Sequence, residues 1–290
     1  MYLEAILAHK KEEIKKKKKA DFFAGLPGKS GNLNLPDGSE NLPGGSPPGP
    51  RENLPGEGLF GRSLPGGKRF RSALAAPGIS VVAEIKRASP SRGPIAPGLD
   101  PVKTAVFYKK SGAAAISVLT EEKFFRGGIH DLRAVKKAST LPVLAKDFFL
   151  EPCQIEEAAG AGADAILLIM AILSRSQAAE LAACARENGV AVLAEVHKEE
   201  ELETALAIDP DVVGINNRDL ETFRVSLETT FRIYPLVPKE YPVISESGIK
   251  DRGDIEALSA LGVDGFLIGE ALAGSGDPGA ALRELLGCRA

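Results

Sequence analysis

Residues 163–197 read ADAILLIMAILSRSQAAELAACARENGVAVLAEVH and contain one complete strand–helix–strand unit. Two short apolar runs, at 163–170 and 189–197, are typical of buried strands. Between them, residues 174–188 repeat apolar side chains at helical spacing, which predicts an amphipathic helix. Because two strands joined through a helix usually lie parallel in one sheet, this stretch predicts an α/β fold.

The same alternation extends over residues 80–290. Six further apolar runs predict strands at 79–86, 112–120, 141–147, 211–217, 241–247 and 263–269. Eight parallel strands with intervening helices predict a (β/α)8 TIM barrel. The competing architecture is an open doubly wound sheet, which would call for a GxGxxG turn after the first strand, and the sequence has none there.

Residues 1–79 are predicted to form an N-terminal extension to this barrel domain of residues 80–290. A helix is expected at about 2–20. Residues 25–67 are dominated by Pro, Gly, Ser and Asn, so they are expected to be irregular. A short helix is expected at about 68–75, immediately before the first strand.

The composition limits the kinds of molecule that this chain is expected to bind. A net charge of −3 gives no polycationic signature for nucleic acid. No apolar run approaches the roughly 20 residues that span a bilayer, and no signal peptide is recognisable. The lysine run at 15–19 is best explained as a solvated helix end, where lysines suit the helix dipole. We therefore expect a cytoplasmic protein that binds neither nucleic acid nor a membrane.

The cysteines and histidines are few and scattered. Cys153, Cys184 and Cys288 form no CxxC pair, and we expect free thiols in a reducing compartment. The three histidines form no HxH or HExxH motif. No metal site is therefore predicted.

Polar residues stand where the predicted strands end. Because strand side chains alternate with period two, Glu84 and Lys86 share one face. Other strands end in a similar way: Lys146 with Asp147, Glu195, Asn216 with Arg218, and Glu246 with Ser247. In a TIM barrel these carboxyl ends meet at one rim, which carries the active site. So many charges on one rim are costly to desolvate unless each has a partner or a ligand.

Two glycines carry a further signal. Gly248 and Gly269 follow the seventh and eighth predicted strands. Barrels commonly bind phosphate at these two turns, on backbone N–H groups and a short helix N-terminus. The sequence therefore predicts a phosphorylated small molecule as substrate.

Several motifs together resemble one known family. They are VVAEIKRASPSRG (81–93), ISVLTEEKFFRGG (116–128), LPVLAKDFFLEPCQI (141–155), AEVHKEEELETAL (194–206), GINNRDLETF (214–223), SESGI (245–249) and GFLIGEAL (265–272). In this order they resemble the indole-3-glycerol phosphate synthase family of the tryptophan pathway. The resemblance implies a carboxy-lyase without a cofactor. It would convert 1-(2-carboxyphenylamino)-1-deoxyribulose 5-phosphate to indole-3-glycerol phosphate, with loss of carbon dioxide and water.

The resemblance also implies roles for residues of this chain. Lys123 matches the general acid, which we expect to act in ring closure, while Lys86 with Glu84 or Glu195 would act in dehydration. The implied catalytic residues are Lys123, Glu195, Glu84, Lys86 and Asn216. The implied substrate-binding residues are Ser89, Lys146, Arg218, Glu246 and Ser247. The implied phosphate-binding residues are Lys86, Gly248, Gly269 and Glu270.

Other interpretations stay open from the sequence. Another phosphate-binding barrel of the same pathway is one, either phosphoribosylanthranilate isomerase or the tryptophan synthase α chain. A catalytically inactive barrel that binds an acidic partner through its lysine-rich N-terminus is another. The family reaches its first strand sooner than this chain does, so a helix that covers the substrate's entrance is expected to be absent, displaced or reduced to residues 68–74. We expect a monomer with at most weak contacts to other tryptophan-pathway enzymes.

Overall fold

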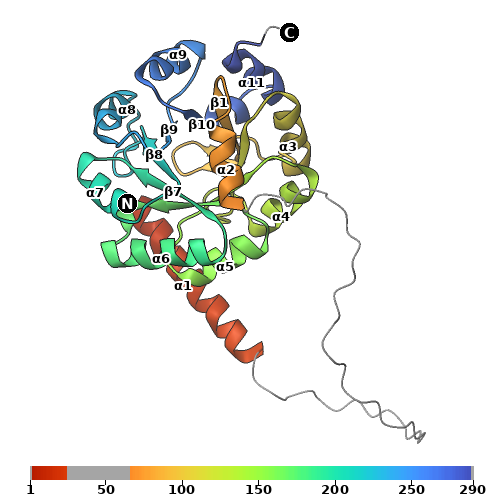
Figure 1. Ribbon diagram of the computed structural model, residues 1–290. Coiled ribbons are helices and arrows are strands. Elements are labelled where there is room, and N and C mark those ends of the chain that lie inside the picture. Colours follow the sequence, from red (N-terminus) through yellow and green to blue (C-terminus); the bar gives the residue numbers. More distant parts are fainter. Residues whose placement is uncertain (1, 25–65, 289–290) are drawn as a thin grey trace, which may run out of the picture. The chain divides into compact units, whose positions relative to one another are not determined.

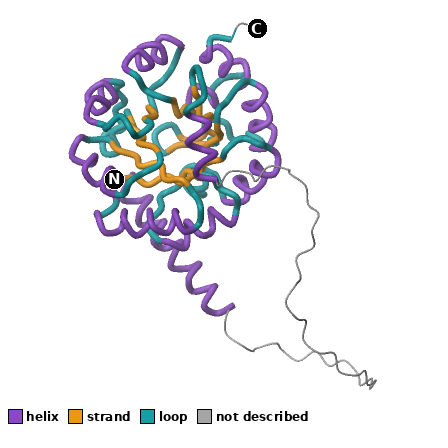
Figure 2. The backbone as a smooth tube through the Cα atoms, viewed as in Figure 1, coloured by secondary structure: helices purple, strands orange, loops and turns teal. Residues whose placement is uncertain are grey.

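A computed structural model describes residues 2–24 and 66–288 of the chain. Eight parallel strands close into a barrel in the order β1-β10-β9-β8-β7-β6-β5-β4. They are β1 (Ser80–Ile85), β4 (Ala115–Leu119), β5 (Val143–Lys146), β6 (Ala165–Ile169), β7 (Ala191–Val196), β8 (Val212–Asn216), β9 (Val243–Glu246) and β10 (Gly265–Ile268). Figure 2 shows these strands as an inner ring surrounded by helices. The predicted (β/α)8 barrel is confirmed.

Helices follow the barrel strands along the chain and surround the barrel. They are α3 (Pro101–Lys110), α4 (Ile129–Ala138), α5 (Pro152–Gly160), α6 (Arg175–Glu187), α7 (Leu202–Ala207), α8 (Glu228–Ile233), α9 (Arg252–Leu261), α10 (Glu270–Ala273) and α11 (Pro278–Leu286). Short 3-10 turns are η1 (Met170–Ile172), η2 (Glu199–Glu201) and η3 (Tyr234–Leu236). The Asp100 side chain accepts the N–H groups of Val102 and Lys103 at the start of α3. Ser174 forms a capping box with Gln177 at the start of α6.

Alternation along each strand produces two apolar cores. Leu144, Leu193 and Leu267 point into the barrel. Their strand neighbours pack outward against the helices, as Ala145 and Ala194 do. Because side chains alternate along a strand, Lys146 and Glu195 share the inward face with Leu144 and Leu193 and are directed toward the barrel axis.

Aspartates tie the amino ends of neighbouring strands together. Asp164 accepts the Val143 N–H at 2.8 Å. In the same way Asp211 accepts the Val192 N–H of β7, and Asp264 accepts the Val243 N–H of β9. Asp164 also pairs with Arg69 and Lys136. This rim of the barrel serves stability, as expected for TIM barrels.

Helix α2 (Gly66–Leu74) closes the same amino end of the barrel. Phe70 and Leu74 are buried in the inner core, and the Gly67 N–H donates to the Gly189 carbonyl just before β7. Figure 1 shows α2 lying across the ring of strands. The segment KRFRSAL therefore does not cover the substrate's entrance, because that entrance lies at the opposite end.

Helix α1 (Tyr2–Ala24) contacts the carboxyl end instead. The part of α1 up to Ile14 belongs to the same compact unit as the barrel, and the rest of the helix belongs to a second unit. The buried Lys10 ammonium lies 2.9 Å from Asp147, directly after β5. Residues 25–65, which include most of the segment predicted to be irregular, lie outside the described residues. Among the helices that are described, none is long and apolar enough to cross a membrane.

A small hairpin follows β1 and was not predicted. Its strands, β2 (Ala88–Ser89) and β3 (Gly93–Pro94), pair antiparallel around the motif SPSRG (89–93). The Arg87 guanidinium anchors the turn by a bidentate pair with Asp131 of α4. The hairpin therefore lies beside the carboxyl end of the barrel, next to Lys86.

Candidate active site

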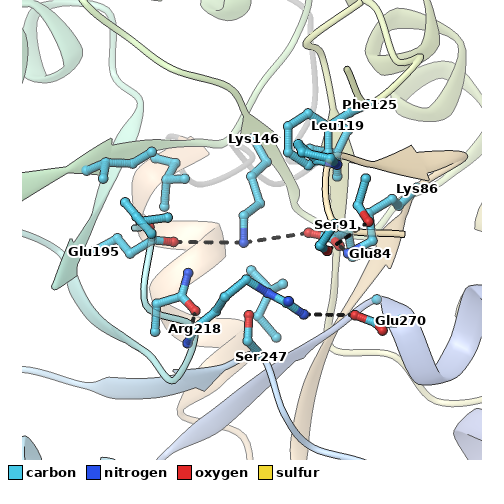
Figure 3. Close-up of a pocket in the computed structure, with 18 of the residues that line it drawn as sticks. Glu84, Lys86, Ser91, Leu119, Phe125, Lys146, Glu195, Arg218, Ser247 and Glu270 are labelled. Carbon is cyan, nitrogen blue, oxygen red and sulfur yellow. Dashed lines mark hydrogen bonds and ion pairs between the residues drawn. The ribbon is translucent and has the colours of Figure 1, made fainter. Parts of the chain in front are cut away.

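A cavity of about 1070 Å³, its open mouth included, lies at the carboxyl ends of the strands. All eight strands or the turns that follow them contribute to its lining, and Figure 3 shows part of it. The sequence-predicted residues that line it are Glu84, Lys86, Ser89, Lys146, Glu195, Asn216, Arg218, Ser247, Gly248, Gly269 and Glu270. The strand-end pattern therefore led to one continuous site.

Lys146 occupies the centre of this site. Its ammonium lies 2.7 Å from Glu246, 3.6 Å from Glu84 and 4.0 Å from Glu195. Figure 3 shows it pointing between Glu195 and Glu84. Burial alone would lower the pKa of Lys146, but the three carboxylates outweigh burial and raise it. Lys146 is therefore a protonated donor at neutral pH.

Glu84 and Lys86, which were predicted to share one face of the first strand, form an ion pair. Their charged atoms are 2.6 Å apart. Burial would raise the pKa of Glu84, but Lys86 and Lys146 together hold it below its usual range. Glu84 is therefore an ionised carboxylate with an ammonium on either side.

The pKa values of Glu195 and Glu246 are shifted in opposite directions although both side chains are buried. Burial would raise the pKa of Glu195, but His197, Lys146 and the Asn216 amide together lower it. Burial raises the pKa of Glu246, and the facing Glu195 carboxylate contributes to that rise despite Lys146. Two carboxyl groups with pKa values pushed apart are the usual arrangement for separate acid and base roles. Glu246 lies behind Lys146 and is not part of the cavity lining.

Two glycines leave room for these carboxylates. A Cβ at Gly269 would lie 2.1 Å from a Glu84 carboxylate oxygen. A Cβ at Gly214 would lie 2.3 Å from a Glu246 carboxylate oxygen. Gly269 is thus needed for the packing of Glu84 as well as being a candidate for phosphate contact.

Cations gather beside the turns after β9 and β10. Ser247 and Gly248 both have positive φ, at 64° and 83°, in the first of these turns. Arg218 lies 2.9 Å from Glu270, and Arg92 pairs with the other Glu270 oxygen at 2.5 Å. Arg218 and Lys86 line the cavity, and such cations suit an anionic group of the substrate.

Apolar side chains form another part of the cavity lining, here called the apolar wall, and the sequence did not predict its full extent. Helix α1 contributes Leu3 and Ile6, while Phe125, Phe148 and Phe223 come from three loops. Such a surface suits a planar aromatic ring. Local patterns did not place α1 over the barrel, although the apolar face of that helix was visible in the sequence.

The expectation that Lys123 lies in the site is not met. Its side chain is exposed, it is absent from the cavity lining, and its ammonium lies 5.2 Å from the centre of the Phe124 ring. The buried Glu121 carboxylate accepts the backbone N–H groups of Lys123, Phe124 and Phe125. This turn directs Phe125 into the cavity and leaves Lys123 in solvent.

Metal ligation finds no support in the part of the chain that the structure describes. No group of three or more His, Cys, Asp or Glu side chains there could hold a metal ion. The carboxylates of the site are bound instead to Lys86 and Lys146.

Known proteins resemble this chain in fold and in sequence. A 3-hexulose-6-phosphate synthase aligns with a TM-score of 0.59 at 19% identity, over 73% of this chain and all of the other. A tryptophan synthase α-subunit from Pyrococcus furiosus aligns with a TM-score of 0.55 at 16% identity, over 72% of this chain and 98% of the other. At such identities these similarities show the barrel fold alone.

Closer sequence similarity defines the family. An indole-3-glycerol phosphate synthase of Dehalococcoides mccartyi is 49% identical over 211 residues, which are 72% of this chain and 82% of that protein. The synthase of Desulfotalea psychrophila is 46% identical over 233 residues, 80% of this chain and 90% of that protein. The family described as indole-3-glycerol phosphate synthase matches residues 64–285. The chain therefore belongs to the indole-3-glycerol phosphate synthase family.

Proposed function

We propose that this chain converts 1-(2-carboxyphenylamino)-1-deoxyribulose 5-phosphate to indole-3-glycerol phosphate, with Lys146 as the acid that starts the reaction. The observation that carries this proposal is the Lys146 ammonium at the centre of the cavity, with three carboxylates within 4.0 Å. The acid proposed here is on β5, one strand after the loop that carries Lys123. Lys146 is protonated and lines the cavity, and both are required of a general acid.

Ring closure forms a carbon–carbon bond. The ring carbon that bears the carboxylate attacks the ketone carbon, and the ketone oxygen takes a proton as the carbonyl π bond breaks. Lys146 donates that proton and stabilises the charge that develops on the oxygen. The neighbouring carboxylates keep Lys146 charged between turnovers.

Decarboxylation follows without a further electron acceptor. The bond to the carboxylate carbon breaks, carbon dioxide leaves, and the electron pair restores the aromatic ring. The apolar wall of Leu3, Ile6 and the phenylalanines packs on that ring. A neutral product is favoured over a carboxylate in such a surrounding, which assists the step.

Dehydration completes the indole. The hydroxyl formed in ring closure leaves as water after taking a proton from an acid, and the carbon next to nitrogen loses a proton to a base. Lys86 is proposed as this acid, with Glu84 or Glu195 as the base. Both carboxylates have lowered pKa values and are therefore ionised at neutral pH, the state that a base requires.

Substrate positioning is assigned to the remaining polar residues. Gly248, Gly269 and Ser247 are proposed to bind the phosphate through the turns after β9 and β10. Arg218 and Lys86 are proposed to hold the substrate's carboxylate before it leaves. Asn216 would orient Glu195, and Ser89 of the small hairpin would contact the substrate from the β1 side.

The setting of the reaction is also a proposal. We expect a cytoplasmic monomer, with a phosphorylated small molecule as its partner. Cys153, Cys184 and Cys288 form no disulfide in the described part of the chain, as is usual for proteins of a reducing compartment.

The test is turnover by the purified full chain. The carboxyphenylamino substrate is supplied, the fluorescence of the indole product is followed, and carbon dioxide is measured in parallel. Equal amounts of indole product and carbon dioxide are expected. Absence of both, in protein that is folded by circular dichroism, would show that the function is wrong.

A further inference from the structure

His197 is a buried ionisable side chain for which the proposed reaction has no use. It lies at the end of β7, two residues after Glu195, and only 4% of its side chain is exposed. It does not line the cavity. It therefore cannot touch the substrate and can act only through a neighbour.

Two carboxylates enclose its ring. Nε2 lies 3.2 Å from Oε1 of Glu195, and Nδ1 lies 3.5 Å from Oε2 of Glu201. Neither contact has the geometry of a hydrogen bond, so the attraction is mainly between charges. The same Glu201 oxygen accepts the His197 backbone N–H at 2.7 Å, which fixes Glu201 beside the ring.

This enclosure selects the charged form of the ring. A neutral imidazole carries one N–H and one lone pair, so one of the two carboxylates would face a lone pair. The imidazolium presents an N–H to both. Burial alone would lower the pKa of His197, but Glu195 and Glu201 raise it to about 10.

We propose that His197 is a positioning residue, an imidazolium held between Glu195 and Glu201 that keeps Glu195 ionised and turned toward the cavity. One Glu195 oxygen is engaged by the ring, which leaves the other, Oε2, facing Lys146 at 4.0 Å. The consequence for catalysis rests on the proposed function, whereas the charge on His197 does not.

The other groups around Glu195 explain why this charge is needed. Lys146 approaches from β5 but is closer to Glu246, at 2.7 Å. Asn216 on β8 supplies a neutral amide, and Glu246 on β9 is a like charge. Without His197, Glu195 and Glu246 would share one ammonium, and Glu195 would be protonated at a higher pH.

The charge can be measured without any activity. Nitrogen-15 NMR of the full chain labelled at histidine reports ring protonation, and the His197 signal is identified by its loss in His197→Gln. We expect a doubly protonated ring from pH 6 to above pH 8. A ring that loses its proton near the ordinary histidine pKa of about 6.5 would overturn the proposal.

The positioning role is measured by pH–rate profiles. His197→Gln keeps an amide N–H but has no charge. We expect it to lower kcat by about 10-fold at neutral pH, in the range known for groups that orient a reactive side chain, with KM little changed. The acidic limb of its kcat/KM profile should move to higher pH.

Two further variants complete the test. Glu201→Gln removes the second carboxylate and should move the acidic limb in the same direction by a smaller amount. Glu203→Gln, on the neighbouring exposed pair with Arg175, should leave the profile unchanged. A loss of stability in His197→Gln and Glu201→Gln with an unmoved limb would show that His197 is merely structural. If His197→Gln does not fold, the His197 signal is assigned by elimination with His9→Gln and His130→Gln, and the NMR titration together with Glu201→Gln still decides.

Discussion

Substitutions of Lys146 and Lys123 distinguish the two candidates for the acid that protonates the ketone oxygen in ring closure. Lys146→Met removes the ammonium from the cavity, and we expect kcat to fall by at least about 100-fold, as for loss of a general acid. Lys123→Met changes an exposed side chain outside the cavity and should leave kcat within about twofold. Steady-state kinetics of the two variants, with circular dichroism to check folding, measures the difference. The opposite order of losses would return the role to Lys123.

The shared position of the polar residues at the strand ends could be predicted from the sequence, but their roles could be predicted only in part. Period-two alternation and the parallel sheet place Glu84, Lys146 and Glu195 on one rim, and this can be worked out from the sequence. Lys123 lies on a loop whose course depends on the buried Glu121. No pattern in the sequence gives the direction of a side chain on such a loop.

His197 should also make stability depend on pH. Its pKa is raised from 6.5 to about 10 in the folded chain, so the folded state binds more protons than the unfolded state in this window. Its contribution is complete below pH 6.5 and is lost as pH rises toward 10. We expect the difference in free energy of unfolding between wild type and His197→Gln to be largest near pH 6 and to shrink by pH 10. Urea unfolding at several pH values measures it, and a difference that is constant with pH would contradict the assignment.

At the scale of elements, α1 is held onto the barrel by a buried ion pair. Lys10 reaches Asp147 at 2.9 Å, and Leu3 and Ile6 of the same helix line the cavity. Removing one partner of a buried pair leaves the other uncompensated. Lys10→Met should therefore loosen α1, raise KM for the aromatic substrate and increase hydrogen exchange in residues 3–10. Lys11→Met, one residue away and exposed, is the matched control. An unchanged KM in Lys10→Met would show that α1 does not contribute to binding.

Strands and helices differed in how well their positions could be predicted. Each barrel strand has an apolar run that only a buried strand explains, so all eight were found from sequence. The position of α2 at the amino end depends on distant partners such as Gly189 and Asp164. A short amphipathic helix carries no information about which face of a barrel it will cover.

For the whole molecule, a ligand that binds only the folded chain should stabilise it. Glycerol 3-phosphate resembles the phosphate end of the substrate. At 100 times its Kd it would add about 2.7 kcal/mol to the free energy of unfolding. Each kcal/mol corresponds to about 2–4 °C in Tm for a chain of this size. Glycerol with sodium chloride at matched ionic strength is the control, and an equal rise with the control would contradict a phosphate site.

The pairing of β1 with β10 joins the beginning of the barrel to its end. Ser80 lies opposite Gly265, so the ring closes only when the last strand is present. Glu84 packs against Gly269 across this same join. During synthesis the chain from β1 onward therefore exists for most of its length without an active site. Helix α1 is made first and must wait for Asp147 before it can dock, so contacts of long sequence separation should make folding slow. The catalytic rim is therefore complete only when the whole barrel has folded. A chain released before β10 is made cannot turn over the substrate.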